Sequence, residues 1–239
     1  MKEVCILFLL FMMYAFLGWS LEVICKLIEK KKFVNRGFLV GPVCPIYGFG
    51  AISITVLLDK YKDDVIILFI MAMVIASVLE YFTSYIMEKL FNARWWDYST
   101  RKFNINGRIC LETLIPFGIL GLLITYVVNP FFLSIIYKLS DISIYILSAI
   151  LIVVFISDLI LSYKVINNVK HTINKYEKDN TIEISTKVRD ILLKRGVLYR
   201  RIVKAFPNIY QTKEYWIRRR ELINERIENI QKKLRNRKK

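Results

Sequence analysis

The sequence predicts an all-α protein: a polytopic membrane helix bundle with about five transmembrane segments, followed by a basic amphipathic helical tail. Two observations predict this class. Hydrophobic residues make up 55% of the 239 residues and the mean hydropathy is +0.40, more apolar surface than a soluble domain of this size needs. The net charge of +16 is also concentrated in the last third of the chain. We therefore expect two parts, a transmembrane bundle over 1–163 and a cytoplasmic tail over 164–239.

Five apolar segments define the predicted bundle. A transmembrane helix needs about 20 apolar residues, so the second segment is marginal unless residues before it contribute. The fourth is long enough to tilt or kink, and it contains two prolines, of which the second is expected to end the helix. No signal-peptide cleavage pattern follows the first, which is therefore predicted to be retained. The segments are Val4–Cys25, Pro45–Leu58, Val65–Met87, Ile109–Tyr137 and Ile142–Tyr163.

The stretch before the second segment, Asn35–Gly50, reads NRGFLVGPVCPIYGFG. Proline removes a backbone donor and glycine permits unusual backbone angles, so this stretch predicts a broken or re-entrant entry to the helix. Non-helical backbone at membrane depth must be shielded by protein or line a wet cavity. The residues predicted to form this structural break are Gly37, Gly41, Pro42, Pro45 and Gly48.

Loop charges predict the orientation. The first and third loops and the tail are rich in lysine and arginine, whereas the second and fourth loops carry only Lys60, Lys62 and Lys138. The positive-inside rule then places the N-terminus outside and the C-terminus on the cytoplasmic side of the membrane.

The tail changes to a charged, amphipathic pattern after Tyr163. Apolar positions from Ile191 to Phe206 predict one helix ended by Pro207, and a second is predicted from about Lys213. A basic amphipathic helix gains about 1 kcal/mol per basic residue near an anionic leaflet. Docking on membrane lipids is the main expectation for the tail. Self-association remains an alternative, and no nucleic-acid-binding module is recognisable.

Four acidic residues lie inside or at the ends of apolar segments, all toward the predicted cytoplasmic side. Glu80 is the deepest, and an intramembrane carboxylate normally faces a partner or a wet cavity, which marks a functional site. The alternative is a structural pair with Arg36 or Arg108. For Glu22 we expect an ion pair with Lys26, one turn later. Interfacial roles are expected for Glu112 and Asp158.

The third loop carries the aromatic sequence RWWDYS and then FNINGR. An aromatic belt at the headgroup layer is one interpretation, and a loop held over the mouth of the bundle is the other. Together with the first loop, it predicts a substrate-binding site formed by Glu22, Asn35, Arg36, Tyr47, Glu80, Trp95, Trp96, Asp97, Tyr98, Asn104 and Arg108.

Several kinds of chemistry have no motif in this chain. There is no GxxxxGK[ST], HExxH or GxSxG pattern. The four cysteines form no CxxC pair and there is one histidine, so neither a metal site nor a cofactor is predicted and no catalytic residue is assigned. The chain is expected not to be an enzyme, with a carboxylate-based membrane enzyme left open.

Long, unusual motifs in this chain resemble the bacterial membrane-protein family called putative ABC-transporter type IV (CmpB-like). These are FLGWSLEV (Phe16–Val23), FVNRGFLVGPVCPIYGFGA (Phe33–Ala51), RWWDYS (Arg94–Ser99) and FNINGRICLE (Phe103–Glu112), with Glu80 in its serine-flanked helix. The resemblance covers roughly residues 8 to 160. It implies a permease subunit working with a separate ATPase. The cytoplasmic EAA-type coupling segment of ABC importers is not found, so the third loop or the tail would have to contact such an ATPase.

Three functions stay open on these grounds. The first is a transporter or permease with a polar site near the inner leaflet. The second is a membrane-embedded enzyme acting on a lipid or isoprenoid-phosphate headgroup, with Arg36 and Arg108 holding phosphate. The third is a non-catalytic assembly or regulatory protein. Five segments are few for a complete pathway, so a homo-oligomer or hetero-complex is expected.

Overall fold

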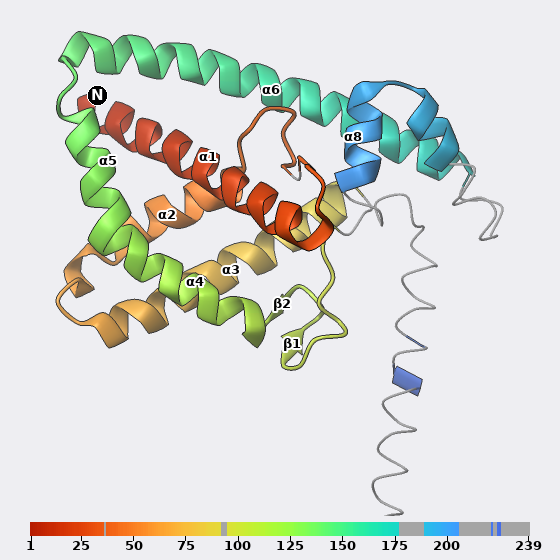
Figure 1. The fold of residues 1–239 in the computed structure, drawn as a ribbon, viewed down its shortest axis with the longest axis horizontal. Coiled ribbons are helices and arrows are strands. Elements are labelled where there is room, and N and C mark those ends of the chain that lie inside the picture. The colour runs from red at the N-terminus through yellow and green to blue at the C-terminus, as the bar shows by residue number, and fades with distance from the viewer. Residues whose placement is uncertain (36, 92–94, 177–188, 206–220, 222–223, 226–239) are drawn as a thin grey trace, which may run out of the picture.

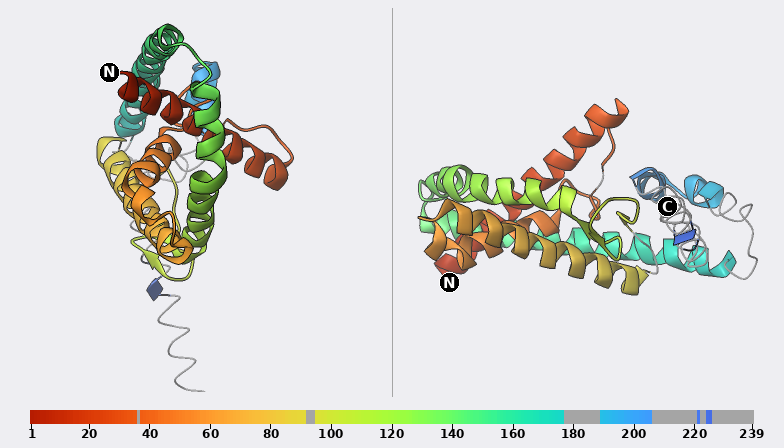
Figure 2. Two further views of the ribbon diagram at one scale, coloured as in Figure 1. Left: turned by 90° about the vertical axis from the view of Figure 1, so that its left-hand side faces the viewer. Right: turned by 90° about the horizontal axis from the view of Figure 1, so that it is seen from below.

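The structure is a computed structural model that describes residues 1–35, 37–91, 95–176, 189–205, 221 and 224–225. Most of its helices run lengthwise (Figure 1), and the first helix leaves the others at an angle when the molecule is seen from below (Figure 2). The elements, in chain order, are α1 (Lys2–Lys30), α2 (Pro45–Leu57), the 3-10 turn η1 (Asp59–Tyr61), α3 (Val65–Phe91), β1 (Asn104–Ile105), β2 (Ile109–Cys110), α4 (Leu111–Leu123), the π-helical turn η2 (Ile124–Val128), α5 (Asn129–Ile136), α6 (Asp141–Tyr176) and α8 (Val197–Ala205).

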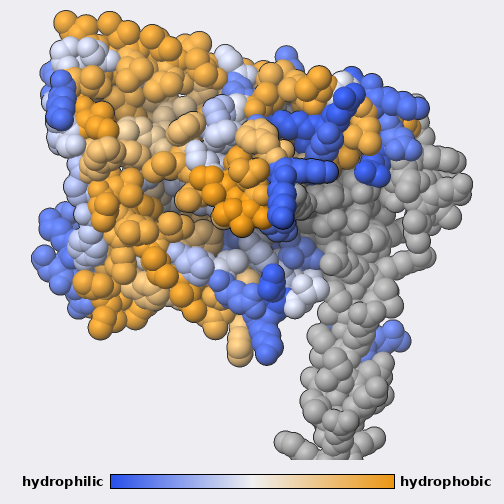
Figure 3. All heavy atoms as spheres, in the orientation of Figure 1, coloured by the Kyte–Doolittle hydropathy of each residue, from blue (hydrophilic) through white to orange (hydrophobic). Residues whose placement is uncertain are grey.

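Four helical stretches are long and apolar enough to cross a membrane. They cover Lys2–Glu29, Val65–Phe91, Leu111–Ile136 and Asp141–Thr172, while Pro45–Leu57 is a shorter apolar helix. Apolar side chains also cover much of the face of the bundle seen in Figure 3, where lipid would contact them. The predicted membrane helix bundle is therefore confirmed, with the second segment as the short one.

Charged residues gather where α1 and α3 end and α4 begins. We call this the basic end of the bundle; it comprises the last turns of α1 and α3, the β1–β2 hairpin and the start of α4. The hairpin is antiparallel, with Asn104 opposite Cys110 and Ile105 opposite Ile109. Its tight turn uses left-handed backbone at Asn106 (φ 53°) and Gly107 (φ 66°). The hairpin joins α3 to α4 at the basic end (Figure 1).

The fourth segment passes both of its prolines without ending. Pro116 lies inside α4, and Pro130 lies in the first turn of α5. Proline has no N–H to give to the carbonyl four residues earlier, and the π-helical turn η2 precedes Pro130 at this point. A wider turn accommodates the missing donor without breaking the helix. The expectation that Pro130 ends this segment is wrong, because the helix continues to Ile136 with only a local change to π-helical geometry.

Glycines allow the closest contacts between helices. A Cβ on Gly48 of α2 would lie 2.6 Å from the Phe11 ring and 2.8 Å from the Phe11 carbonyl oxygen of α1. A Cβ on Gly121 of α4 would lie 2.4 Å from Cβ of Ala72 in α3. Small residues let helix backbones approach in this way, which is how helices pack where lipid removes the hydrophobic driving force.

The tail begins as a continuation of the bundle, since α6 runs without a break from Asp141 to Tyr176. The predicted helix after Ile191 is divided: residues 189–194 are helical, and α8 begins only after Gly196, whose φ is 147°. The buried residues Ile202 and Ala205 of α8 pack with Val165 and Ile166 of α6. The apolar face of α8 is therefore covered by protein. The helix predicted from Lys213 lies outside the described residues.

Candidate functional site

The chain between α1 and α2 enters the bundle as non-helical backbone. Leu39 is fully buried, and the amide of Cys44 donates to the carbonyl of Ala15 in α1 over 2.9 Å. Ala15 lies eleven residues before Lys26, about 16 Å along an α-helix. The α2 helix then begins at Pro45, where a missing N–H costs nothing. We call residues 31–44 the entry loop. Figure 1 shows it running from the end of α1 toward α6, beside α8.

Side chains from α6 satisfy the amides of the entry loop. Asp158 accepts from the Val40 amide through Oδ1 (2.9 Å) and from the Gly41 amide through Oδ2 (2.9 Å). Ser162 also accepts from the Val40 amide, at 3.0 Å, and donates to Asp158 Oδ1 at 3.1 Å. A Cβ on Gly41 would lie 2.8 Å from Asp158 Oδ2, so only glycine fits here without a shift. Asp158 therefore binds loop backbone, instead of the interfacial role expected for it.

Arg201 of α8 satisfies the carbonyls of the same loop. Its Nη1 donates to the Leu39 carbonyl (2.5 Å) and its Nη2 to the Phe38 carbonyl (3.3 Å). Burial lowers the pKa of the Arg201 guanidinium, and the negative charge of Asp158 opposes that shift. A guanidinium nevertheless stays protonated in proteins. The tail thus supplies donors where the loop backbone has no helical partner.

Asn35 stabilises the conformation of the entry loop. Its Oδ1 accepts from Trp19 Nε1 at 2.8 Å and from the Gly37 amide at 3.1 Å, and its Nδ2 donates to the Val40 carbonyl at 3.1 Å. With both ends of the amide engaged, Asn35 acts as a loop-folding residue. Its predicted neighbour Arg36 lies outside the described residues.

Glu22 and Tyr47 join α1 to α2. The Tyr47 hydroxyl donates to Glu22 Oε1 over 2.8 Å. Room for the ring comes from Gly18, where a Cβ would lie 2.1 Å from Tyr47 Cγ. Lys26 pairs with Glu29, three residues later, and the hydrogen bond from Tyr47 gives Glu22 a contact across helices.

Glu80 lies on α3 and points into the protein. Its side chain is only 5% exposed, and the Tyr98 hydroxyl donates to its Oε1 at 3.1 Å. Among the residues that the structure describes, nothing hydrogen-bonds to Glu80 Oε2, which is buried. Burial raises the pKa of Tyr98, and the carboxylates of Glu80 and Glu22 raise it further. Tyr98 therefore keeps its proton and donates.

Arg108 does not pair with Glu80, contrary to one of the predicted alternatives. Its guanidinium donates to Ser84 Oγ at 3.2 Å and forms an ion pair with Glu88 Oε2 at 2.9 Å. The rings of Tyr81 and Tyr85 lie 5.6 and 5.4 Å from its Cζ. These contacts all come from α3, so Arg108 fastens the hairpin to α3 instead of facing a ligand.

The remaining predicted site residues of the third loop hold its fold. Asp97 accepts from the amide and hydroxyl of Ser99 (3.1 and 2.8 Å), and Trp96 Nε1 donates to the Arg108 carbonyl at 3.0 Å. Trp95 is buried against Phe38 and Phe91. It therefore occupies a core position and does not belong to an aromatic belt at the headgroup layer.

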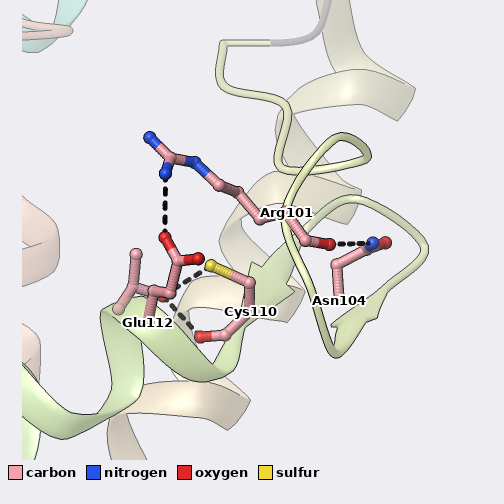
Figure 4. A network of polar contacts seen from close by, with 5 residues as sticks. Arg101, Asn104, Cys110 and Glu112 are labelled. Atoms are coloured by element: carbon pink, nitrogen blue, oxygen red, sulfur yellow. Dashed lines mark hydrogen bonds and ion pairs between the residues drawn. The ribbon is translucent and has the colours of Figure 1, made fainter.

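Asn104 closes the hairpin turn. Its Nδ2 donates to the Arg101 carbonyl at 2.7 Å, and its Oδ1 accepts from the Gly107 amide at 3.0 Å. Figure 4 shows this contact beside the ion pair of Arg101 with Glu112, which measures 2.9 Å and lies at the surface. Glu112 thus has the interfacial pairing expected for it.

Two carboxylates and two tyrosine hydroxyls thus form the candidate site, which we call the tyrosine–glutamate site: Glu22, Tyr47, Glu80 and Tyr98. The negative charges of both glutamates act on Tyr98, which places all three in one electrostatic neighbourhood. No group of three or more His, Cys, Asp and Glu side chains among the described residues could hold a metal ion. Over the described residues, the arrangement offers oxygen ligands from two carboxylates and two hydroxyls, and such ligands suit a positively charged species.

Sequence reasoning missed the role of two residues. Asp158 was assigned to the interface and Arg201 was not singled out among the basic residues of the tail, yet both bind the entry loop. An aspartate inside an apolar segment was the available signal for the first. The amphipathic pattern gave no signal for the second.

Comparison with known proteins identifies one family. The family model described as putative ABC-transporter type IV matches residues 9–163, which is more than half of the chain and confirms the resemblance seen in the motifs. Searches of curated proteins and of solved structures found no match.

Proposed function

The chain belongs to the putative ABC-transporter type IV family, and from this premise we propose that it is a membrane transport protein in which Glu80 binds a cation. The apolar helices fit a protein embedded in a membrane. The bound cation is either the transported species or an ion that couples transport, and protons and ammonium groups share the chemistry that this site offers.

The observation that carries this proposal is the buried Oε2 of Glu80, which has no hydrogen-bond partner among the described residues. A carboxylate buried without a cation or a full set of hydrogen bonds costs several kcal/mol, and intramembrane carboxylates mark ion and proton pathways. The Tyr98 hydroxyl satisfies only Oε1. A proton or a cation on Oε2 would remove the cost.

The surroundings of Glu80 support a transport role. The entry loop interrupts the helical path between α1 and α2 and brings Tyr47 to Glu22. Broken helices beside a binding site are a recurrent device of transporters. The proposed orientation, from loop charge, places the basic end in the bacterial cytoplasm. A separate ATPase would contact the hairpin or the tail there.

The lipid-phosphate enzyme is less well supported than transport. Its proposed phosphate ligand, Arg108, is 8% exposed and already engaged by Ser84 and Glu88. A regulatory role for the tail has its own observation, the contact of Arg201 with the entry loop, which is taken up below.

Glu80→Gln should abolish transport without unfolding the protein. Glutamine keeps the size of the side chain and can still accept from Tyr98, but it neither binds a proton nor carries a charge. Membrane vesicles containing the full chain would be incubated with a small-molecule extract of the same cells, with and without an imposed proton gradient. Mass spectrometry would identify the accumulated solutes.

We expect at least one solute to accumulate with the wild type and to fall about tenfold or more in Glu80→Gln, the effect of losing roughly 1.4 kcal/mol of binding. Glu112→Gln is the matched control, because that carboxylate is exposed and paired at the surface. Equal accumulation in both variants would overturn the cation site. Dependence on the gradient distinguishes a proton from another cation.

A further inference from the structure

A second group of polar contacts lies outside the tyrosine–glutamate site. Phe38, Leu39, Val40 and Gly41 are held from two sides, by Asp158 and Ser162 of α6 and by Arg201 of α8. We call these three side chains the clamp. The sequence separation from loop to clamp is more than 115 residues in each of these contacts, so only the fold brings them together.

The clamp solves a problem that the membrane imposes on the loop. Non-helical backbone at this depth has amides and carbonyls without helical partners, and lipid cannot satisfy them. The carboxylate of Asp158 accepts from two consecutive amides, and the guanidinium of Arg201 donates to two consecutive carbonyls. Charged groups make stronger hydrogen bonds than neutral ones. Removing either group would leave buried backbone unsatisfied.

The two halves of the clamp are anchored differently. Asp158 and Ser162 belong to α6, a helix of 36 residues. Arg201 belongs to α8, a helix of nine residues that follows the left-handed residue Gly196 and packs through one apolar face. A short helix held by one face detaches more easily than a long one. The guanidinium is therefore the half of the clamp that can be withdrawn.

The clamped residues 38–41 lie close in sequence to the tyrosine–glutamate site. Asn35 precedes them, and Tyr47 of the site follows them after only Pro42 to Ile46. Asn35 itself bonds to the Val40 carbonyl at 3.1 Å, and Arg201 Nη1 lies 3.5 Å from the same oxygen. Loss of the Arg201 contacts would free residues 38–40 to shift, and the backbone from Gly41 to Ile46 would transmit that shift to Tyr47 and its contact with Glu22.

We propose that Asp158 and Arg201 are positioning residues that hold the entry loop, and that withdrawal of α8 releases the loop and so regulates access to the tyrosine–glutamate site. The regulatory part rests on the proposed transport function, whereas the clamping itself does not. The carboxyl-terminal segment is then a control element of the bundle.

Hydrogen–deuterium exchange of the full chain in detergent tests the clamp directly. The amides of Val40 and Gly41 donate to Asp158, and peptides that contain them report the state of the loop. We expect Arg201→Ala to speed exchange in these peptides about tenfold or more, while peptides from α3 and α4 keep their rates. Arg201→Lys should restore protection in part, because lysine keeps the charge but not the fork of donors.

Arg200→Ala is the matched control. Arg200 is the exposed neighbour on the same helix, and its replacement removes the same charge. The thiol of Cys44, at the end of the loop, gives a second measure through its alkylation rate relative to the exposed Cys25. Unchanged exchange and alkylation in Arg201→Ala would overturn the clamp, as would equal effects of Arg200→Ala.

Exchange separates this inference from the proposed function. Glu80→Gln should leave loop exchange at the wild-type rate, even where it abolishes transport. If the loop is released in Arg201→Ala and solute accumulation in the vesicle assay is unchanged, the regulatory part is wrong and the clamp is only structural. A changed accumulation rate in Arg201→Ala, partly rescued by Arg201→Lys, supports regulation.

Discussion

Replacing Arg108 by methionine should lower the free energy of unfolding by about 2–3 kcal/mol, the largest effect we expect from a single charged side chain. Breaking a buried ion pair by removing one partner costs about 3–5 kcal/mol, and the lower value reflects the partial exposure of Glu88 (33%). The change would also leave buried Ser84 without its donor and remove the guanidinium from Tyr81 and Tyr85.

Arg101→Met provides the matched control in the same loop. Arg101 also pairs with a glutamate, Glu112, but the two side chains are 60% and 52% exposed. Exposed pairs contribute about 0–1 kcal/mol. Thermal unfolding of both variants in the same detergent measures the contrast. Equal losses for the two arginines would show that the hairpin is not fastened through Arg108.

Gly48→Ala should destabilise the protein by about 1–3 kcal/mol, the usual cost of overpacking a close contact. A Cβ here meets the Phe11 ring at 2.6 Å and the Phe11 carbonyl oxygen at 2.8 Å. The ring could rotate, but the carbonyl belongs to the backbone of α1. The two helices would have to separate, which would also strain the Tyr47–Glu22 contact one position away.

Gly50→Ala tests the same helix without the clash. The nearest atom to a Cβ at Gly50 is Leu79 Cδ1, at 3.8 Å, an ordinary contact. Alanine favours a helix over glycine by about 1 kcal/mol, so this variant should be neutral or slightly stabilised. Thermal unfolding in detergent again gives the measurement, and a loss of stability at Gly50 comparable to that at Gly48 would contradict the packing.

Local features of the sequence were enough to predict the bundle. Segment lengths and hydropathy depend on neighbouring residues alone, so the long spans and the short second helix could be predicted. The glycines and prolines around Gly41 and Pro45 likewise predicted non-helical backbone before α2. Glu80 was predicted to face the protein because lipid penalises a carboxylate wherever it stands in a span.

Partners of the polar residues could not be predicted, because they depend on how the helices pack. A pair with an arginine was one of the alternatives for Glu80, and the partner found among the described residues is the Tyr98 hydroxyl. Trp95 and Trp96 have the composition of a membrane belt, yet Trp95 packs in the core beside Phe38. Arg201 and Leu39 are 162 residues apart in the sequence. A local periodic pattern cannot predict a contact between residues so far apart.

The π-helical turn at Ile124–Val128 gives the fourth span two faces that a regular helix could not combine. A π turn holds one residue more than an α turn, and each extra residue rotates everything after it by about 100°. Before this turn, Gly118 and Gly121 face α3; after it, Phe132 and Ile136 pack with Tyr14 of α1. One inserted residue therefore lets the same span pack against α3 before the turn and against α1 after it.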